Sequence, residues 1–120
     1  MKRDMDLIRE IMLLAEESDE YPIYDLDISG YSMQQVAYHC KLLYEADLVS
    51  AYEGFYGDDK LVDFAVGDLT PSGCDFLDKI RENGAWAKLK KYLKEKGPDI
   101  ALGGLNAIVS AVLSGVIKIS

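Results

Sequence analysis

The sequence predicts an α+β domain, and three observations carry that prediction. An amphipathic run begins after Gly30-Tyr31-Ser32 and continues through residues 33–43, with apolar side chains at the 3.6-residue spacing of a helix. Residues 44–49, Tyr-Glu-Ala-Asp-Leu-Val, end that run, and two short apolar-alternating stretches follow on either side of residues 57–60. A helix followed by a two-stranded hairpin is the order typical of a winged helix. We therefore expect a winged-helix-like domain over residues 1–82 and a C-terminal helical extension over residues 83–120.

The N-terminal segment predicts a first helix from Asp4 to about Glu17, because aspartate is a favourable N-cap. Apolar side chains follow at helical spacing on one side of it: Leu7, Ile8, Ile11, Met12, Leu14 and Ala15. Pro22 and the residue before it resist a helical conformation, so this helix should end near residue 18. The alternating segment Tyr24–Ile28 then predicts a short strand that joins the later hairpin as a third member of its sheet.

The second helix, capped by Ser32, should present one apolar and one polar face. The inward face carries Val36, His39, Cys40, Leu43 and Ala46. The opposite face carries Gln34, Ala37, Tyr38, Lys41 and Glu45. Strands are expected at about Leu48–Phe55 and Leu61–Val66, joined by a turn over residues 57–60 that contains the glycine and aspartates a hairpin needs.

Further helices are expected after the hairpin. Thr70-Pro71 starts one that carries Phe76, Leu77 and Ile80 inward, and Asn83-Gly84 ends it. A fourth, Ala85–Lys96, is amphipathic, and Gly97-Pro98 ends it. Its apolar face carries Ala85, Trp86, Leu89, Tyr92 and Leu93, and its other face carries Lys88, Lys90, Lys91 and Lys94. Residues 100–117 form a last segment without a charged side chain.

Composition bounds the class of protein. At 120 residues, 49% hydrophobic and 28% charged, the chain has the composition of one ordinary globular domain. Its two cysteines, Cys40 and Cys74, lack the spacing of a disulfide framework, so we expect reduced thiols in a cytoplasmic protein and leave open whether the two interact. The first residues lack the apolar run of a signal peptide, and we expect none.

The net charge of −8 is distributed unevenly. Residues 1–70 hold 5 Lys and Arg against 16 Asp and Glu, a net of −11, whereas residues 71–97 hold 7 against 4, a net of +3. An electrostatic partner would therefore meet an acidic body and one basic helix.

Several motifs give the chain a resemblance to a known family. They are Met1-Lys2-Arg3-Asp4-Met5, Tyr38-His39-Cys40-Lys41-Leu42-Leu43, Leu69-Thr70-Pro71-Ser72-Gly73, Phe76-Leu77 and Glu82-Asn83-Gly84-Ala85-Trp86. Over about residues 1–97 the sequence resembles the YjcQ-like, phage- and prophage-associated proteins. The resemblance implies a small winged-helix-like core extended by C-terminal helices, and it implies no catalytic or binding residue.

Nucleic-acid binding is the first hypothesis, because the helix before a wing enters the major groove. Its contacts would be Gln34, Tyr38 and Lys41 on the helix and Lys60 on the hairpin, yet the acids around them would repel phosphate. A displaced phosphate-binding face could come from Lys88, Lys91 and Lys94 on the basic helix. The alternatives are that these lysines only meet water and that the winged helix is a scaffold for protein contacts.

No motif indicates an enzyme. The chain lacks a nucleophile elbow, a Gly-rich phosphate loop and a zinc-binding helix motif, and its single histidine, His39, sits toward the apolar side of its helix. We therefore expect a non-enzymatic protein with no cofactor and no metal.

The apolar C-terminal segment supports the second hypothesis, self-association. Gly103, Ala107, Ala111 and Gly115 recur every four residues, a spacing that lets helices approach closely, and Trp86 and Tyr92 offer a packing surface. A membrane span over residues 100–117 would be at the short limit and is disfavoured by its polar residues. The leading expectation is thus a regulatory or adaptor module of phage or prophage type that forms homo-oligomers. The more specific version of this expectation is that the module binds DNA. The alternative is a protein-interaction or membrane-associated factor acting through the C-terminal helix.

Overall fold

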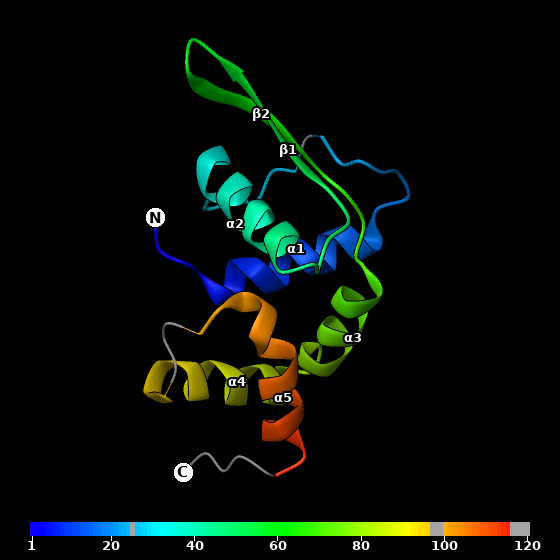
Figure 1. The fold of residues 1–120 in the computed structure, drawn as a ribbon, viewed down its shortest axis with the longest axis vertical. Helices are drawn as coiled ribbons and strands as arrows, with labels where there is room; N and C mark the ends of the chain where they lie inside the picture. Colours follow the sequence, from blue (N-terminus) through cyan, green and yellow to red (C-terminus); the bar gives the residue numbers. More distant parts are fainter. Residues whose placement is uncertain (25, 97–99, 116–120) are drawn as a thin grey trace.

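The computed structural model describes residues 1–24, 26–96 and 100–115 and confirms the α+β prediction (Figure 1). Its elements follow in the order α1 (Met5–Glu17), α2 (Met33–Glu45), β1 (Tyr52–Gly57), β2 (Lys60–Val66), α3 (Pro71–Ile80), α4 (Asn83–Lys96), the 3₁₀ turn η1 (Leu102–Gly104) and α5 (Leu105–Leu113). The arrangement of helices around one hairpin is compatible with a winged-helix-like domain. The expected helix stop at Gly97-Pro98 lies outside the described residues.

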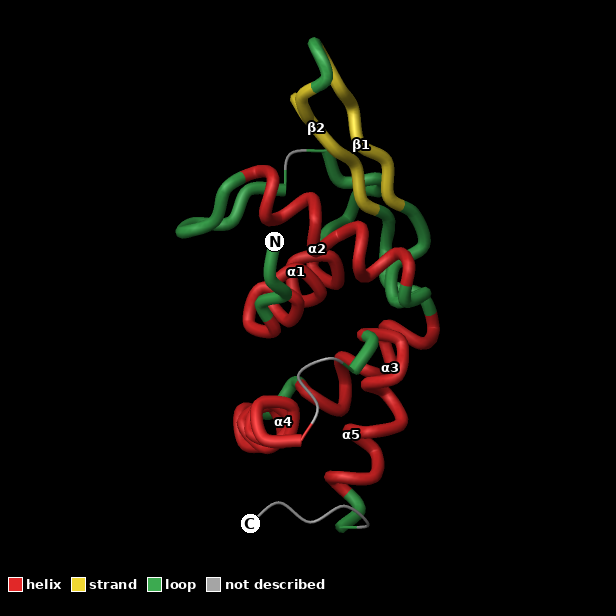
Figure 2. Tube along the Cα trace, turned by 60° about the vertical axis from the view of Figure 1, so that its left-hand side comes forward, coloured by secondary structure: helices red, strands yellow, loops and turns green. Residues whose placement is uncertain are grey.

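The molecule is elongated, with principal extents of 48 × 29 × 23 Å. The hairpin stands at one end of the long axis, α1 and α2 cross in the middle, and α3, α4 and α5 form the other end (Figures 1 and 2). One continuous apolar core joins these parts, because Leu7 and Ile11 of α1 belong to the same buried cluster as Trp86 of α4 and Leu105 of α5. Helix α1 therefore supports both the α2–hairpin half and the C-terminal helices.

The N-termini of the helices form as the sequence predicts. The Asp4 carboxylate accepts a hydrogen bond from the Leu7 backbone N–H (3.1 Å), and Ser32 and Gln35 form a reciprocal capping box at the start of α2. Thr70 caps α3 by accepting from the Gly73 N–H (3.0 Å), with Pro71 in the first helical turn. Each cap satisfies backbone donors that have no partner within the helix.

The exit of α2 is a Schellman motif. The Leu48 N–H donates to the Leu43 carbonyl (2.9 Å) and the Asp47 N–H to the Tyr44 carbonyl (3.0 Å), while Asp47 adopts the left-handed φ of 60°. Glycine is usual at that position because it has no Cβ, and aspartate is one of the few residues that tolerate it. The motif turns the chain sharply, so that α2 leads directly toward the hairpin.

The sheet is smaller than predicted. The strands β1 and β2 pair antiparallel, Val62 is an extra residue in β2, and Asp58 and Asp59 both have positive φ (53° and 64°), as a type I′ turn requires. The prediction that the first strand begins at Leu48 is wrong, because among residues 48–51 only Val49 forms a β-bridge, an isolated one with Leu69, and β1 begins at Tyr52. The predicted third strand at Tyr24–Ile28 is also wrong within its described residues. Only Ile23, one residue earlier, pairs with Val66, through hydrogen bonds of 2.8 and 3.1 Å.

The C-terminal half departs from prediction at two boundaries. Helix α3 ends at Ile80 and Asn83 begins α4, so Asn83-Gly84 starts a helix instead of ending one. The Arg9 side chain donates to the carbonyls of Ile80 (3.1 Å) and Arg81 (2.5 Å), which a helix terminus leaves without partners. The apolar segment after residue 100 is not one long helix, because η1 and the nine-residue α5 share its described part.

Candidate nucleic-acid interface

The outer side of α2 carries the predicted base-facing residues. Gln34 and Lys41 are exposed, and Tyr38 is half-buried with its ring edge-on to the His39 ring (centroids 5.3 Å apart). The prediction that Ala37 lies on this side is wrong, since Ala37 is 2% exposed and belongs to the core. The polar outer strip of α2 is therefore narrower than the helical wheel suggests.

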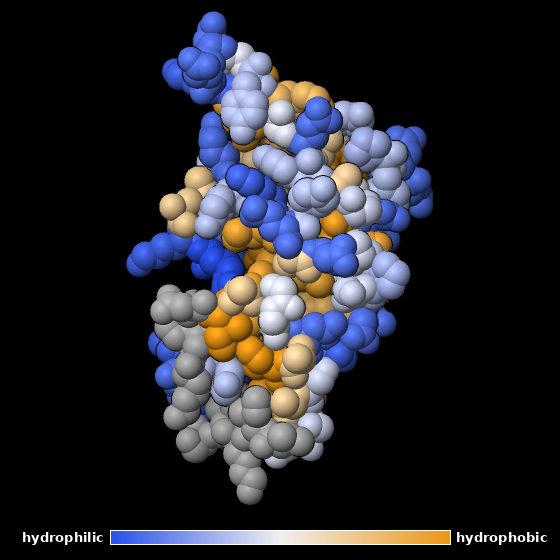
Figure 3. All heavy atoms as spheres, viewed as in Figure 1, coloured by the Kyte–Doolittle hydropathy of each residue, from blue (hydrophilic) through white to orange (hydrophobic). Residues whose placement is uncertain are grey.

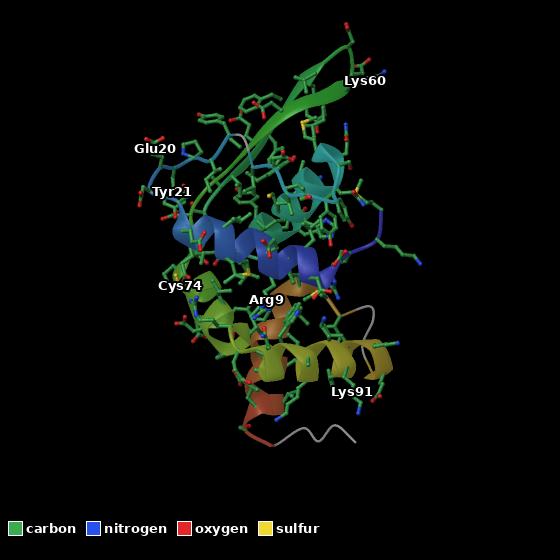
Figure 4. The ribbon with its side chains drawn as sticks, turned by 180° about the vertical axis from the view of Figure 1, so that it is seen from behind. Arg9, Glu20, Tyr21, Lys60, Cys74 and Lys91 are labelled. Atoms are coloured by element: carbon green, nitrogen blue, oxygen red, sulfur yellow. The ribbon has the colours of Figure 1, made fainter. Side chains whose placement is uncertain are left out.

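Lys60 lies at the tip of the hairpin, next to the Asp58-Asp59 turn (Figure 4). The surface of this tip is strongly hydrophilic (Figure 3). All three side chains are exposed, so the tip presents two carboxylates beside one ammonium group. Against a phosphate backbone this balance is unfavourable, since affinity for DNA derives largely from neutralised phosphates.

The N-terminal residues add a cation that the sequence reasoning did not place. Lys2 and Arg3 lie beside α2 and, together with Gln35 and His39, line a concavity of about 480 Å³. Lys2 is exposed, whereas the Arg3 guanidinium donates to the Ile100 carbonyl (2.6 Å). The only signal in the sequence is the Asp4 cap, because fixing the start of α1 also fixes the direction of the residues before it.

The lysines of α4 lie at the other end of the molecule. Figure 4 shows Lys60 and Lys91 at opposite ends of the long axis. Lys88 and Lys94 are exposed, as is Lys91. The structure thus brings Gln34, Tyr38 and Lys41 together on one helix and separates them from the basic face of α4, so a single small ligand cannot contact both sets.

Two basic residues outside α2, Arg81 and Lys90, form ion pairs with carboxylates of α1. The Lys90 ammonium group donates to the Asp6 carboxylate (2.9 Å), as does the Trp86 indole N–H (2.9 Å). The Arg81 guanidinium donates two hydrogen bonds to the Glu16 carboxylate (2.7 and 2.6 Å). Lys90 and Arg81 therefore help to hold the C-terminal helices on α1, which reduces the charge that α3 and α4 offer to an outside partner.

These ion pairs predict an acid-side loss of stability. Lys90 and then Trp86 lower the pKa of Asp6, Arg81 lowers the pKa of Glu16, and Lys79 and then Asn106 lower the pKa of Asp75. Because each folded pKa lies below the unfolded one, the unfolded chain binds more protons in this range. The stabilisation is complete above the ordinary carboxyl pKa values of about 4 and is lost as the pH falls through the folded pKa values.

Urea unfolding at several pH values between neutrality and about pH 3 measures this effect. The free energy of unfolding should fall below about pH 4.5, and Asp6→Asn should make that fall shallower. Asp19→Asn removes an exposed aspartate that makes no ion pair within the described residues, and it should leave the fall unchanged. Equal effects of the two variants would contradict the assignment to Asp6.

His39 and Cys40 are core residues. The His39 Nε2 accepts from the Asp4 backbone N–H (2.8 Å) and its Nδ1 bonds the Gln35 carbonyl (2.7 Å), which assigns the ring hydrogen to Nδ1. Burial raises the pKa of the Cys40 thiol to about 12, so it is an inert thiol. Cys74 is exposed, and both cysteines are free. Among the described residues, no group of His, Cys, Asp and Glu side chains could hold a metal ion.

The residues predicted for self-association lie in different settings. Trp86 is 4% exposed in the core and Tyr92 is half-buried. Only Ala107 and Ala111 lie on α5, while Gly103 lies in η1 near Ala46 and Gly115 follows the helix with a φ of 82°. An apolar surface covers part of η1 and α5 (Figure 3). None of the helices among the described residues has the length and apolar character needed to cross a membrane.

Comparison with known proteins identifies the family. The sequence family described as "Hypothetical protein (DUF2513)" matches residues 2–99. The chain belongs to the DUF2513 family. A Haemophilus influenzae protein named "Uncharacterized protein" is 33% identical over 116 residues, which is 95% of this DUF2513 chain and 97% of the relative. No solved structure matches the chain significantly.

Proposed function

We propose that this DUF2513 protein is a non-enzymatic regulatory module that binds duplex DNA through α2 and the β1–β2 hairpin. The observation that carries the proposal is the outer strip of α2, where Gln34 and Lys41 are exposed and Tyr38 is half-buried, beside a hairpin with Lys60 at its tip. A helix in this position enters the major groove, where a glutamine can pair with the edge of adenine. The phage or prophage type indicated by the YjcQ-like motifs and a cytoplasmic location belong to the same proposal.

The electrostatics predict weak, salt-sensitive binding. Lys41 is an exposed cation of the strip, Lys2 is exposed beside α2 and Lys60 is exposed at the hairpin tip. The carboxylates of Glu45, Asp58 and Asp59 are exposed on the same helix and hairpin. If two or three phosphates are neutralised, log K should fall against log salt with a slope of about −2 to −3. Regulation by such a protein would then depend on several copies or on a partner that adds affinity.

Fluorescence anisotropy with a pool of random duplexes at about 50 mM salt tests the proposal. Lys41→Glu combined with Lys60→Glu should weaken binding at least about tenfold. Gln34→Ala should relax base preference while leaving the salt slope unchanged. Lys88→Glu combined with Lys94→Glu makes the same change in charge at the other end of the molecule and should leave binding nearly intact. The absence of binding at low salt, or a loss confined to the α4 variant, would refute it.

The exposed side of α5 favours one alternative function, contact with another protein or a second copy. Ala107 is exposed and Leu113 is 41% exposed, although α5 buries Leu105 and Val109 in the core. Deleting α5 would remove these buried core residues, so the double variant Ala107→Glu with Leu113→Glu is a better test than truncation of the chain. The alternative expects an oligomer in light scattering that becomes monomeric in this variant, or partitioning into vesicles if the partner is a membrane. A protein that is monomeric and does not partition into vesicles would eliminate this alternative.

A further inference from the structure

A small pocket lies beside β2, on the molecule's hairpin half. It is bounded by Tyr24, Leu26 and Asp27, by the first turn of α2 and by the middle of β2, and its volume is about 210 Å³. Ordinary small-molecule sites occupy about 300–1,000 Å³, so this pocket is smaller than a typical substrate site. Its size suits one long side chain of a partner.

The floor of the pocket is apolar and its rim is acidic. Val36 and Phe64 are 1% and 2% exposed, and Leu26 and Met33 are partly buried beside them. Asp27 and Asp63 also line the pocket, and their carboxylates form no salt bridge within the described part of the chain. An aliphatic stem would fit the floor, while a cation at its end would meet the carboxylates.

An aromatic wall completes this arrangement. Tyr24 lines the pocket, is 51% exposed and stacks on Phe55 of β1, with ring centroids 6.5 Å apart and planes inclined by 26°. The faces of aromatic rings attract guanidinium and ammonium groups. An apolar floor, two carboxylates and an aromatic ring together match the chemistry of arginine, and to a lesser degree of lysine.

The backbone of β2 beside the pocket argues against recognition by strand addition. Val66 is already paired with Ile23, and the next outward-facing N–H, that of Phe64, donates to the Asp63 side chain (2.8 Å). A capped edge N–H cannot join a ladder with an added strand. Recognition at this place must therefore depend on side chains.

We propose that this pocket binds an arginine or lysine side chain of a basic segment in a partner protein. Charge complementarity favours a protein partner of this kind, because residues 1–70 carry a net charge of −11 and would attract a basic segment from a distance. This inference goes beyond the proposed DNA contact, since the pocket uses the start of α2 and the outer edge of β2 instead of Gln34, Tyr38 and Lys41.

NMR titration with ¹⁵N-labelled full chain tests the proposal. The probe is a capped five-residue peptide with a central arginine between glycine and serine residues. The control is the same peptide with neutral citrulline in place of the arginine. The arginine peptide should shift the amide signals of Leu26, Asp27, Met33, Val36 and Phe64. The citrulline peptide should bind at least about tenfold more weakly, because it keeps the shape and loses the charge.

Matched variants separate the pocket from the general acidity of the surface. Asp27→Asn with Asp63→Asn should weaken binding about tenfold, and the amide side chain introduced at position 63 retains an oxygen that can accept from the Phe64 N–H. Asp58→Asn with Asp59→Asn removes the same two charges from the hairpin tip and should change binding less than about twofold. Asp27→Asn alone spares the Asp63 contact if the double variant unfolds.

Four results would overturn the proposal. These are no shifts up to about 10 mM peptide, equal losses in the two double variants, free arginine binding as tightly as the peptide, and self-association without peptide that Asp27→Asn abolishes. The third would indicate a small-molecule site and the fourth a second copy of this chain as the occupant.

Discussion

Replacing Gly73 by alanine is expected to lower the free energy of unfolding by about 3 kcal/mol. Gly73 lies in the first turn of α3, and its backbone packs against the Leu48 residue that leaves α2. An added Cβ would lie 3.0 Å from the Leu48 carbonyl carbon and would overlap its oxygen. The carbonyl carbon and oxygen of Leu48 are backbone atoms, so neither can rotate away as a side chain would.

Leu48 cannot move because three contacts fix it. Its N–H closes the Schellman motif on Leu43, its carbonyl accepts from the Thr70 N–H (3.1 Å), and its side chain is 3% exposed. The Thr70 hydroxyl also donates to the Asp47 carbonyl (2.5 Å). Alanine at position 73 must therefore separate α3 from the end of α2, which opens the core between them.

Thermal and urea unfolding followed by circular dichroism measure the loss. Gly103→Ala is the matched control, because its Cβ would lie 3.7–3.9 Å from Ala46, an ordinary van der Waals distance, and no left-handed φ is required there. We expect that variant to stay within about 0.5 kcal/mol of the parent chain. If Gly73→Ala unfolds at the same temperature and urea concentration as Gly103→Ala, the close approach of α3 to Leu48 is not tight in solution.

This contact also gives a structural reason for the Leu69-Thr70-Pro71-Ser72-Gly73 motif. Thr70 supplies the cap, Pro71 a preset first turn, and Gly73 the room for Leu48. From the sequence alone only the first two roles were predictable, because they depend on neighbours along the chain. The third depends on a residue 25 positions earlier and required the fold.

Local chemistry likewise explains which elements the sequence predicts well. Asp4, Ser32 and Thr70 each start a helix where expected, because a cap acts within three residues of itself. Asn83-Gly84 was predicted wrongly as a helix end. Its local preference lost to long-range contacts, since Arg9 of α1 binds the Ile80 and Arg81 carbonyls and the Asn83 side chain (3.0 Å).

The candidate sites were predictable only in part for the same reason. Gln34 and Lys41 could be placed on the outer face of α2 because helical periodicity gives the face directly. The pocket beside β2 could not be predicted, since it joins Asp27, Met33 and Asp63 from three segments. The wrongly predicted third strand has the same cause, because Tyr24, Leu26 and Asp27 border the pocket instead of pairing with β2.

Trp86→Ala is expected to cost about 4 kcal/mol of unfolding free energy. Trp86 is 4% exposed, and the Arg9 guanidinium and the Lys90 ammonium group each lie 5.7 Å from the centroid of its ring. Its indole N–H donates to Asp6 of α1 (2.9 Å). Truncation therefore removes a large buried ring, a hydrogen bond and the surface that holds two cations in place.

Trp86→Phe separates these contributions. Phenylalanine keeps most of the apolar ring but loses the N–H, so the expected cost is about 1–2 kcal/mol. Circular dichroism must follow the unfolding, because Trp86 is the single tryptophan and its removal abolishes the tryptophan signal. Equal costs for the two variants would mean that the hydrogen bond to Asp6, and not the ring, holds α4 on α1.

The shape of the Trp86→Ala transition decides whether residues 83–120 fold with the rest. Trp86, Leu89 and Leu105 share one buried cluster with Leu7 and Ile11 of α1. Loss of Trp86 should therefore lower the midpoint of a single transition for the whole chain, because α1 serves both halves of that cluster. Two separate transitions, with the α2–hairpin half unchanged, would instead show that the C-terminal helices melt as an independent unit on a self-sufficient winged-helix-like core.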